Sequence, residues 1–212
     1  MSSVFDLYVV TDRKASGGRA ESEVSRLAFA GGADVVQLRM EGYPKKEVLE
    51  QARLIKEYAD EYSKLFIVND HVDIAIESDA DGVHLGQSDM SVEDARKILG
   101  IEKLIGVTVH NVEEAMKAEE GGADYISVGS IFKTTVKHDA IQNLGLDVVF
   151  NIRQAVDIPL IAIGGINRGN IQDVIRAGAD GVAVVSAAVS GDDITRSVHE
   201  LRDLILKVRP NI

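Results

Sequence analysis

The sequence predicts an α/β fold, a single (β/α)8 TIM barrel. Short apolar runs rich in β-branched residues alternate with longer amphipathic segments along the whole chain, which is the strand and helix order of such a barrel. Some short runs, such as 160–163 and 182–185, are wholly apolar, which is typical of parallel strands buried on both faces. The chain has 212 residues, 45% of them hydrophobic, so we expect one domain over residues 1–212.

Eight apolar runs are expected as strands, and each is followed by a helical segment. The expected strands are Asp6–Thr11, Asp34–Arg39, Leu65–Asn69, Gly82–Leu85, Leu104–Val107, Tyr125–Val128, Leu160–Ile163 and Gly181–Val185. The clearest helical patterns cover Lys45–Tyr62, Val92–Leu99, Val112–Glu120, Gln172–Ala177 and Ile194–Val208. An open, doubly wound sheet is the alternative, but the first turn after a strand has no G-x-G-x-x-G sequence.

A short phrase recurs where helices end and strands begin: 32–34, 80–82, 122–124 and 178–180 all contain Ala-Asp, three of them after Gly. Glycine ends a helix in the left-handed conformation, and the Ala-Asp pair then leads into the next strand. We expect this phrase to be structural, without a catalytic role.

Two acidic residues follow two neighbouring strands. Asp70 comes after the run 65–69, and Asp89 lies in the turn after His84-Leu85. Carboxylates at adjacent parallel strand ends converge, and Mg²⁺ binds through one or two carboxylates plus water or phosphate oxygens. The alternative is that each aspartate is a helix N-cap. Both positions together, with Asn69 beside them, favour a metal site.

Other polar or glycine residues also gather at the expected strand ends, where active sites of such barrels lie. Gly164-Gly165 and Ser186 follow the last two strands, a frequent phosphate site, although Gly-Gly could also be only a tight turn. Arg39 and Lys137 would supply positive charge to a second anionic group. The strand ends also carry Thr11, Asp12, Gln37, Asn69, Thr108 and His110.

The remaining histidines and the long segment 129–145 give weaker signals. A loop of this length in a compact barrel usually closes over a ligand. His84 is expected in the core, supporting the site, and His110 is equally a cap neighbour or a ligand. His138 and His199 are expected to face solvent.

Composition excludes several function classes. The chain has no cysteine, which excludes disulfides, thiolate metal sites and cysteine nucleophiles. Its formal net charge of −11, without a cluster of Lys and Arg, argues against nucleic acid and anionic membranes as partners. No signal peptide or membrane-crossing run is evident. We therefore expect a cytoplasmic protein that acts on small molecules, and a homo-oligomer stays open.

With these residues in place, the chain resembles the thiamine-phosphate synthase family over nearly its whole length. The most specific match is Asn69-Asp70 together with the sequence H-L-G-Q-S-D at 84–89, because many phosphate-binding barrels share the Gly-Gly turn but not this acidic pair. Further matching segments are 7–12, 36–39, 80–83, 105–108, 123–126, 129–132, 137–140 and 162–166.

The resemblance implies that the protein joins hydroxymethylpyrimidine diphosphate to a thiazole phosphate, giving thiamine phosphate and pyrophosphate by a dissociative mechanism. It implies that Asp70 and Asp89 hold Mg²⁺, and that Arg39, Lys137 and Thr108 act at the reacting centre. Gln37, Arg39, Asn69, Thr108 and Lys137 would surround the pyrimidine substrate. The thiazole phosphate would be held by Thr134, Thr135, Val136, Gly165, Val185 and Ser186.

The sequence departs from the family pattern at three positions. Glu41 stands where Q-L-R-x-K has lysine, and Lys133 and Val136 replace the proline and the second threonine of P-T-x-T-K. Two alternatives stay open: a thiazole tautomerase, which would need a histidine near Ser130, and a non-catalytic barrel that binds a phosphate ligand.

Overall fold

The computed structural model describes residues 4–134 and 143–209, and in these residues eight parallel strands form a closed barrel. Each strand pairs with the next in sequence, and β8 pairs with β1, so the fold prediction is confirmed and the open sheet is excluded. The strands are β1 Leu7–Val10, β2 Val35–Leu38, β3 Leu65–Asn69, β4 Gly82–Leu85, β5 Leu104–Val109, β6 Tyr125–Val128, β7 Leu160–Ile163 and β8 Gly181–Val184.

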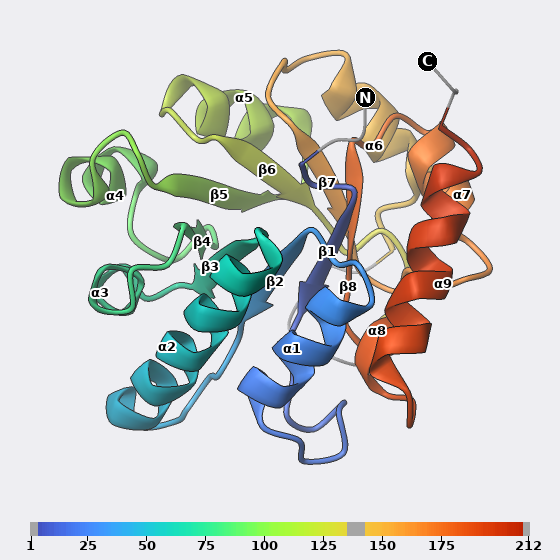
Figure 1. Cartoon of the computed structure of the whole chain (residues 1–212). Helices are drawn as coiled ribbons and strands as arrows, with labels where there is room; N and C mark the ends of the chain where they lie inside the picture. Colours follow the sequence, from blue (N-terminus) through green and yellow to red (C-terminus); the bar gives the residue numbers. More distant parts are fainter. Residues whose placement is uncertain (1–3, 135–142, 210–212) are drawn as a thin grey trace.

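The helices surround the ring of strands (Figure 1). They are α1 Glu21–Ala30, α2 Lys45–Tyr62, α3 Val72–Glu77, α4 Val92–Leu99, α5 Val112–Glu120, α6 Leu146–Arg153, α7 Ile171–Arg176, α8 Ser186–Val189 and α9 Ile194–Leu206. Among the described residues no helix has the length and apolar composition needed to cross a membrane.

Most expected boundaries are confirmed, and the differences are small. Strand β5 extends beyond the expected Val107, because Thr108 and Val109 pair with Ser127 and Val128 of β6. The described residues contain one helix more than the eight expected, the short helix α8, which begins directly after β8. Because β8 pairs with β1, the first and last strands belong to one sheet, and we propose a single domain over residues 1–212.

Two separate apolar layers fill the structure. The outer layer lies between the strands and the helices and contains most of the buried aliphatic side chains. The inner layer fills the barrel from its interior and has few members: Phe5, Tyr8, Val35, Ile67, Tyr125, Ile161 and Ala183. Residues of a strand alternate between the two layers, so inward-facing polar side chains near the carboxyl ends face one shared space.

The recurring Ala-Asp phrase has a structural role that repeats four times. Asp34, Asp81, Asp124 and Asp180, here called the four strand aspartates, precede β2, β4, β6 and β8. In each case the carboxylate accepts the backbone N–H of a residue in the preceding strand, at 2.7–3.2 Å. The backbone N–H of the same aspartate donates to the carbonyl of that same residue, at 2.8–2.9 Å.

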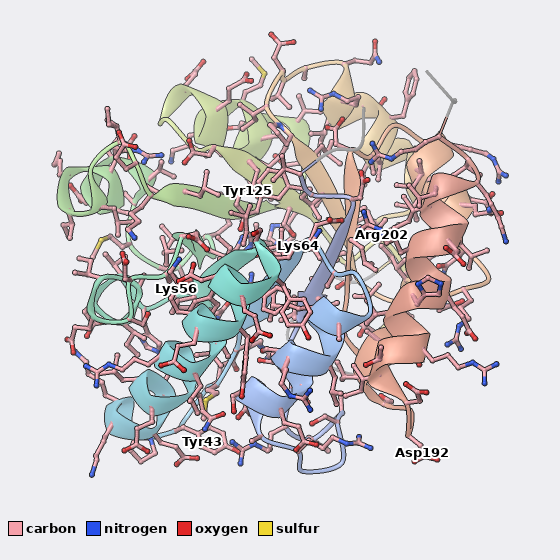
Figure 2. The ribbon with its side chains drawn as sticks, viewed as in Figure 1. Tyr43, Lys56, Lys64, Tyr125, Asp192 and Arg202 are labelled. Atoms are coloured by element: carbon pink, nitrogen blue, oxygen red, sulfur yellow. The ribbon has the colours of Figure 1, made fainter. Side chains whose placement is uncertain are left out.

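Each strand aspartate also pairs with a cation from an outer helix or, for Asp34, also with Lys64, which lies two residues after the end of α2. Asp34 accepts Lys64 Nζ at 2.7 Å and Arg202 Nη1 at 2.8 Å, whereas Asp81 accepts Lys56 Nζ at 3.1 Å. Figure 2 labels these three cations. Asp124 and Asp180 pair in the same way with Arg96 and Arg153. The recurring Ala-Asp motif thus joins neighbouring strands to each other and the outer helices to the barrel, at the amino ends of the strands.

The left-handed helix ends expected from glycine are confirmed at Gly32, Gly122 and Gly178, with φ of 96°, 90° and 108°. The fourth copy, 80–82, has no glycine before its alanine, and Asp79 takes the left-handed conformation there instead, with φ of 54°. Aspartate is among the residues that tolerate this region best.

We expect Asp34→Ala to lower the free energy of unfolding by about 3 kcal/mol, because Leu7 N–H and two cations lose their shared acceptor. Urea denaturation followed by circular dichroism measures the change. Asp203→Ala is the matched control, since Asp203 is exposed on α9, and a change within about 0.5 kcal/mol is expected. A loss below about 1 kcal/mol at Asp34 would contradict the structural role given to the phrase.

Candidate active site

A cavity of about 500 Å³ opens at the carboxyl ends of the strands. Every strand supplies at least one lining residue, because the inward-facing positions of all eight strands converge there. The inward-facing residues from β1 to β8 are Tyr8, Gln37, Asn69, His84, Thr108, Ser127, Ile163 and Ala183.

The site residues predicted from the sequence lie around this one cavity where the structure describes them. Those that line it are Gln37, Arg39, Asn69, Asp70, Asp89, Thr108, Thr134, Gly165, Val185 and Ser186. Thr135, Val136 and Lys137 lie outside the described residues, as does His138. The cavity therefore gathers predicted residues from both halves of the chain.

Neither member of the acidic pair caps a helix. The N-cap of α3 is His71, and the N-cap of α4 is Ser91, whose side chain accepts the N–H of Asp94. Asp70 instead adopts a left-handed conformation with φ of 63°, and its N–H donates to the carbonyl of His84 at 2.9 Å. The capping alternative is thus wrong for both aspartates.

Asp89 closes the turn that follows β4. Its Oδ2 accepts the N–H of Gly86 at 2.6 Å, while its own N–H donates to the carbonyl of Gly86 at 3.2 Å. This contact fixes the carboxylate at the cavity wall. The left-handed backbone at Asp70 and the turn at Asp89 thus place both residues beside the same cavity.

The two carboxylates are the kind of oxygen ligand that a hard divalent cation binds, and a bound substrate would supply further oxygen ligands. Within residues 4–134 and 143–209, no group of three or more His, Asp or Glu side chains is arranged to hold a metal. The protein thus offers two carboxylates, and Mg²⁺ commonly binds through one or two protein carboxylates and takes further oxygens from phosphate and water.

Arg39 lies at the cavity wall between two carboxylates. Its Nη1 is 3.3 Å from Asp12 Oδ2, and its Nε donates to Glu41 Oε1 at 2.8 Å. Glu41, one of the three residues that depart from the family pattern, is therefore in contact with Arg39. Lys133 is exposed, and in the part of the chain that the structure describes no ion pair joins it to Glu41. Arg39 is thus a charge partner of Glu41 among the described residues.

The Gly164-Gly165 turn is close to the loop after β6. A Cβ at Gly164 would overlap Ser130, and a Cβ at Gly165 would lie 2.6 Å from the carbonyl oxygen of Lys133. Both residues also have positive φ, of 102° and 64°. The tight-turn interpretation is therefore correct in geometry, and the same turn still lines the cavity next to Ser186, the first residue of α8.

His84, His110 and His199 follow the sequence expectations, whereas His138 lies outside the described residues. His84 is buried, with Nε2 2.9 Å from Thr108 Oγ1. The Nδ1 of His110 bonds Glu114 Oε2 at 2.9 Å, next to the N-cap Asn111 of α5, and the residue also lines the cavity. His199 is exposed on α9.

Sequence reasoning missed two tyrosines in the barrel interior. Tyr8 OH and Tyr125 OH lie 2.9 Å apart, Gln37 Nε2 donates to Tyr8 OH at 2.9 Å, and His84 Nδ1 is 3.1 Å from Tyr125 OH. Burial raises the pKa of both tyrosines well above that of a tyrosine in water, so both keep their hydrogens. The available signal was a phenolic side chain at an inward-facing position of an otherwise apolar strand.

Comparisons with known proteins agree with this geometry. The family model described as thiamine monophosphate synthase matches residues 7–188. The chain is 50% identical over 199 residues to the thiamine-phosphate synthase of Chloroflexus aurantiacus, covering 94% of this chain and 92% of the relative. It is 48% identical over 201 residues to the enzyme of that name from Methanoculleus marisnigri, covering 95% of each.

Solved structures give the same result. The thiamine phosphate pyrophosphorylase from Pyrococcus furiosus superposes with a TM-score of 0.89 at 39% identity, covering 97% of each chain. A 3-hexulose-6-phosphate synthase superposes with a TM-score of 0.68 at 19% identity, which shows the shared barrel fold only. On the family model and these relatives, the chain belongs to the thiamine monophosphate synthase family.

Proposed function

We propose that this chain joins hydroxymethylpyrimidine diphosphate to a thiazole phosphate, giving thiamine phosphate and pyrophosphate. The chain is a transferase of thiamine biosynthesis, as its family membership indicates. The observation that carries the proposal is one cavity lined by Asp70, Asp89 and Arg39 from one set of strand ends, and by Gly165 and Ser186 from another. Two anionic groups, a diphosphate and a phosphate, match these two parts of the wall.

The diphosphate would lie beside Arg39 and the acidic pair. Asp70 and Asp89 would hold Mg²⁺, which when bound supplies positive charge to the departing pyrophosphate. Arg39 adds fixed donors for the same oxygens, and its two carboxylate partners hold the guanidinium in one orientation. Charge compensation on the leaving group is the main requirement of a dissociative reaction, which needs no general base at the carbon.

The thiazole phosphate would lie at the Gly165 and Ser186 wall. Backbone N–H groups at a glycine turn and at the start of the short helix α8 suit a phosphate, and barrels of this type often bind phosphate after strands 7 and 8. Thr134 lines the same cavity. Roles for Thr135, Val136 and Lys137 stay predictions, as does the cytoplasmic location.

The reaction breaks the C–O bond between the pyrimidine methylene and the diphosphate, and the electron pair leaves with pyrophosphate. The thiazole nitrogen then uses its lone pair to form the new C–N bond. Gln37, Asn69 and Thr108 would orient the pyrimidine ring from the cavity floor, and Arg39, Thr108 and Lys137 would contact the reacting groups. Holding the two substrates in line lowers the entropy cost of the second step.

Two other functions were open from the sequence. A thiazole tautomerase would need a histidine near position 130, and Ser130 lines the cavity there. A non-catalytic barrel would have no need for paired carboxylates at the wall. The curated relatives that support this proposal are named as synthases.

The test is pyrophosphate release by the purified protein with both thiamine precursors and Mg²⁺, with product mass measured in parallel. We expect thiamine phosphate and pyrophosphate in equal amounts, and no release when either precursor is omitted. Release that does not depend on the thiazole phosphate would indicate a diphosphatase and contradict the proposal.

We expect Asp70→Asn and Asp89→Asn each to lower turnover at fixed Mg²⁺ by at least about tenfold, because the leaving group loses a compensating cation. Steady-state rates at increasing Mg²⁺ measure the effect, which extra Mg²⁺ should partly restore. Asp203→Asn on α9 is the matched control and should keep the wild-type rate. Unchanged activity in the double variant would contradict the metal assignment.

Glu41 allows a test that is specific to this chain. Glu41→Lys removes the partner of Arg39 Nε and adds a cation at the cavity edge, so the Michaelis constant for the pyrimidine diphosphate should fall about two- to fivefold. The constant for the thiazole phosphate should not change. Glu41→Gln keeps an acceptor oxygen and separates charge from hydrogen bonding. Loss of turnover in a folded Glu41→Lys variant would mean that Arg39 needs this carboxylate.

A further inference from the structure

Five side chains from five strands form a continuous hydrogen-bonded chain across the barrel interior. In order they are Gln37, Tyr8, Tyr125, His84 and Thr108, with neighbouring atoms 2.9–3.1 Å apart. We call this the interior polar chain. Four of the five members line the cavity, and Tyr125, which is fully buried, is the one that does not.

Tyr125, labelled in Figure 2, lies at the middle of the interior polar chain and belongs to the inner apolar layer of the barrel. Its ring packs against Phe5, Tyr8 and His84, with centroids 4.9, 6.1 and 5.6 Å away. Gly106, its pairing partner on β5, provides the space, because a Cβ at Gly106 would overlap the Tyr125 ring. Three aromatic rings and the backbone of Gly106 thus surround the Tyr125 ring, although Tyr125 does not line the cavity.

The interior polar chain begins at a fixed donor and then allows two orders of hydrogens. A side-chain amide nitrogen can only donate, so Gln37 Nε2 gives its hydrogen to Tyr8 O. In one order, the single hydrogen of Tyr8 goes to Tyr125 O and that of Tyr125 goes to His84 Nδ1, so that each tyrosine hydrogen has an acceptor inside the interior polar chain. The high pKa of both tyrosines means that both hydrogens are present.

The far end of the interior polar chain is set by the same rule. If His84 Nδ1 accepts a hydrogen bond, the neutral imidazole carries its hydrogen on Nε2. His84 Nε2 then donates to Thr108 Oγ1, and the hydroxyl hydrogen of Thr108 is directed to another acceptor. In the reverse order, Thr108 would donate to His84, and Tyr8 would have to direct its hydrogen into the cavity.

We propose that Tyr125 is a positioning residue that sets the tautomer of His84 and so makes Thr108 a hydrogen-bond donor to the substrate. The proposal rests on the proposed function, in which Thr108 contacts the pyrimidine. A pyrimidine ring nitrogen has a lone pair and accepts hydrogen bonds, so it matches a donor at Thr108. Tyr125 would thereby act on substrate selection without touching the substrate.

Tyr125→Phe removes one hydroxyl and keeps the ring that fills the barrel. We expect the dissociation and Michaelis constants for hydroxymethylpyrimidine diphosphate to rise about tenfold, the size of one hydrogen bond in a buried site. The Michaelis constant for the thiazole phosphate should stay within about twofold. Tyr62→Phe is the matched control, since Tyr62 stacks on Phe29 in the outer layer and should show neither change. Equal effects on both substrates would overturn the proposal.

The tautomer itself can be observed without turnover. In protein labelled with ¹⁵N-histidine, His84 of the wild type should show a hydrogen on Nε2 and a bare Nδ1, with its signal identified from its loss in His84→Asn. Tyr125→Phe should change this signal toward a mixture of tautomers. A wild-type His84 with its hydrogen on Nδ1, or on both nitrogens, would overturn the proposal.

A second variant reverses the hydrogen order and leaves Tyr125 unchanged. Gln37→Glu replaces the donor by a carboxylate that accepts from Tyr8, so each later hydrogen must turn around and His84 should carry its hydrogen on Nδ1. The wild type could show the expected tautomer and yet release no pyrophosphate when both thiamine precursors are present. In that case the proposed function fails while the hydrogen order stands. An unchanged tautomer in both Tyr125→Phe and Gln37→Glu would overturn the role of Tyr125.

Discussion

The reciprocal contact between each strand aspartate and the strand before it fixes the register on which the rest of the barrel depends. Two hydrogen bonds join each of Asp34, Asp81, Asp124 and Asp180 to a single residue of the preceding strand, and a helix cation holds the carboxylate from outside. A slip of one residue would break both bonds and turn every inward side chain outward. Since all strands are parallel, register fixed at their amino ends also fixes which residues meet at their carboxyl ends.

The interior polar chain is the second consequence of that register. Polar groups inside an apolar barrel are tolerated only when they are hydrogen-bonded, and each of these five side chains has a partner inside the chain. The arrangement separates two tasks. The aspartates hold the scaffold at one end, while Tyr125 and its neighbours shape the floor of the cavity near the other.

The sequence was sufficient for most of the fold because its strands are short, apolar and separated by helices of regular period. Helices α2, α4 and α5 have the predicted bounds, whereas the short helix α8 was missed since four residues show no period. The rim residues were predictable because parallel strands of a barrel all end at one face. Asp70, Asp89 and Arg39 therefore lie at the same cavity, as expected.

What the sequence did not reveal depends on pairs that are far apart along the chain. Tyr8 and Tyr125 are separated by 117 positions, and only barrel closure brings their hydroxyls together. The contact between Glu41 and Arg39 is local, but its direction depends on rotamers that no periodicity encodes. In strands buried on both faces, the inward and outward residues are similarly apolar, so their alternation is hidden.

We propose that the two carboxylates at neighbouring strand ends act on one diphosphate through a shared cation. A crystal structure of the protein with Mg²⁺ and pyrophosphate tests this most directly. We expect one octahedral Mg²⁺ with oxygen ligands at about 2.0–2.1 Å. These ligands should come from Asp70, Asp89 and the pyrophosphate, directly or through one water, with Arg39 bonded to the same pyrophosphate. Pyrophosphate bound at Gly165 and Ser186, with no metal at the aspartates, would contradict it.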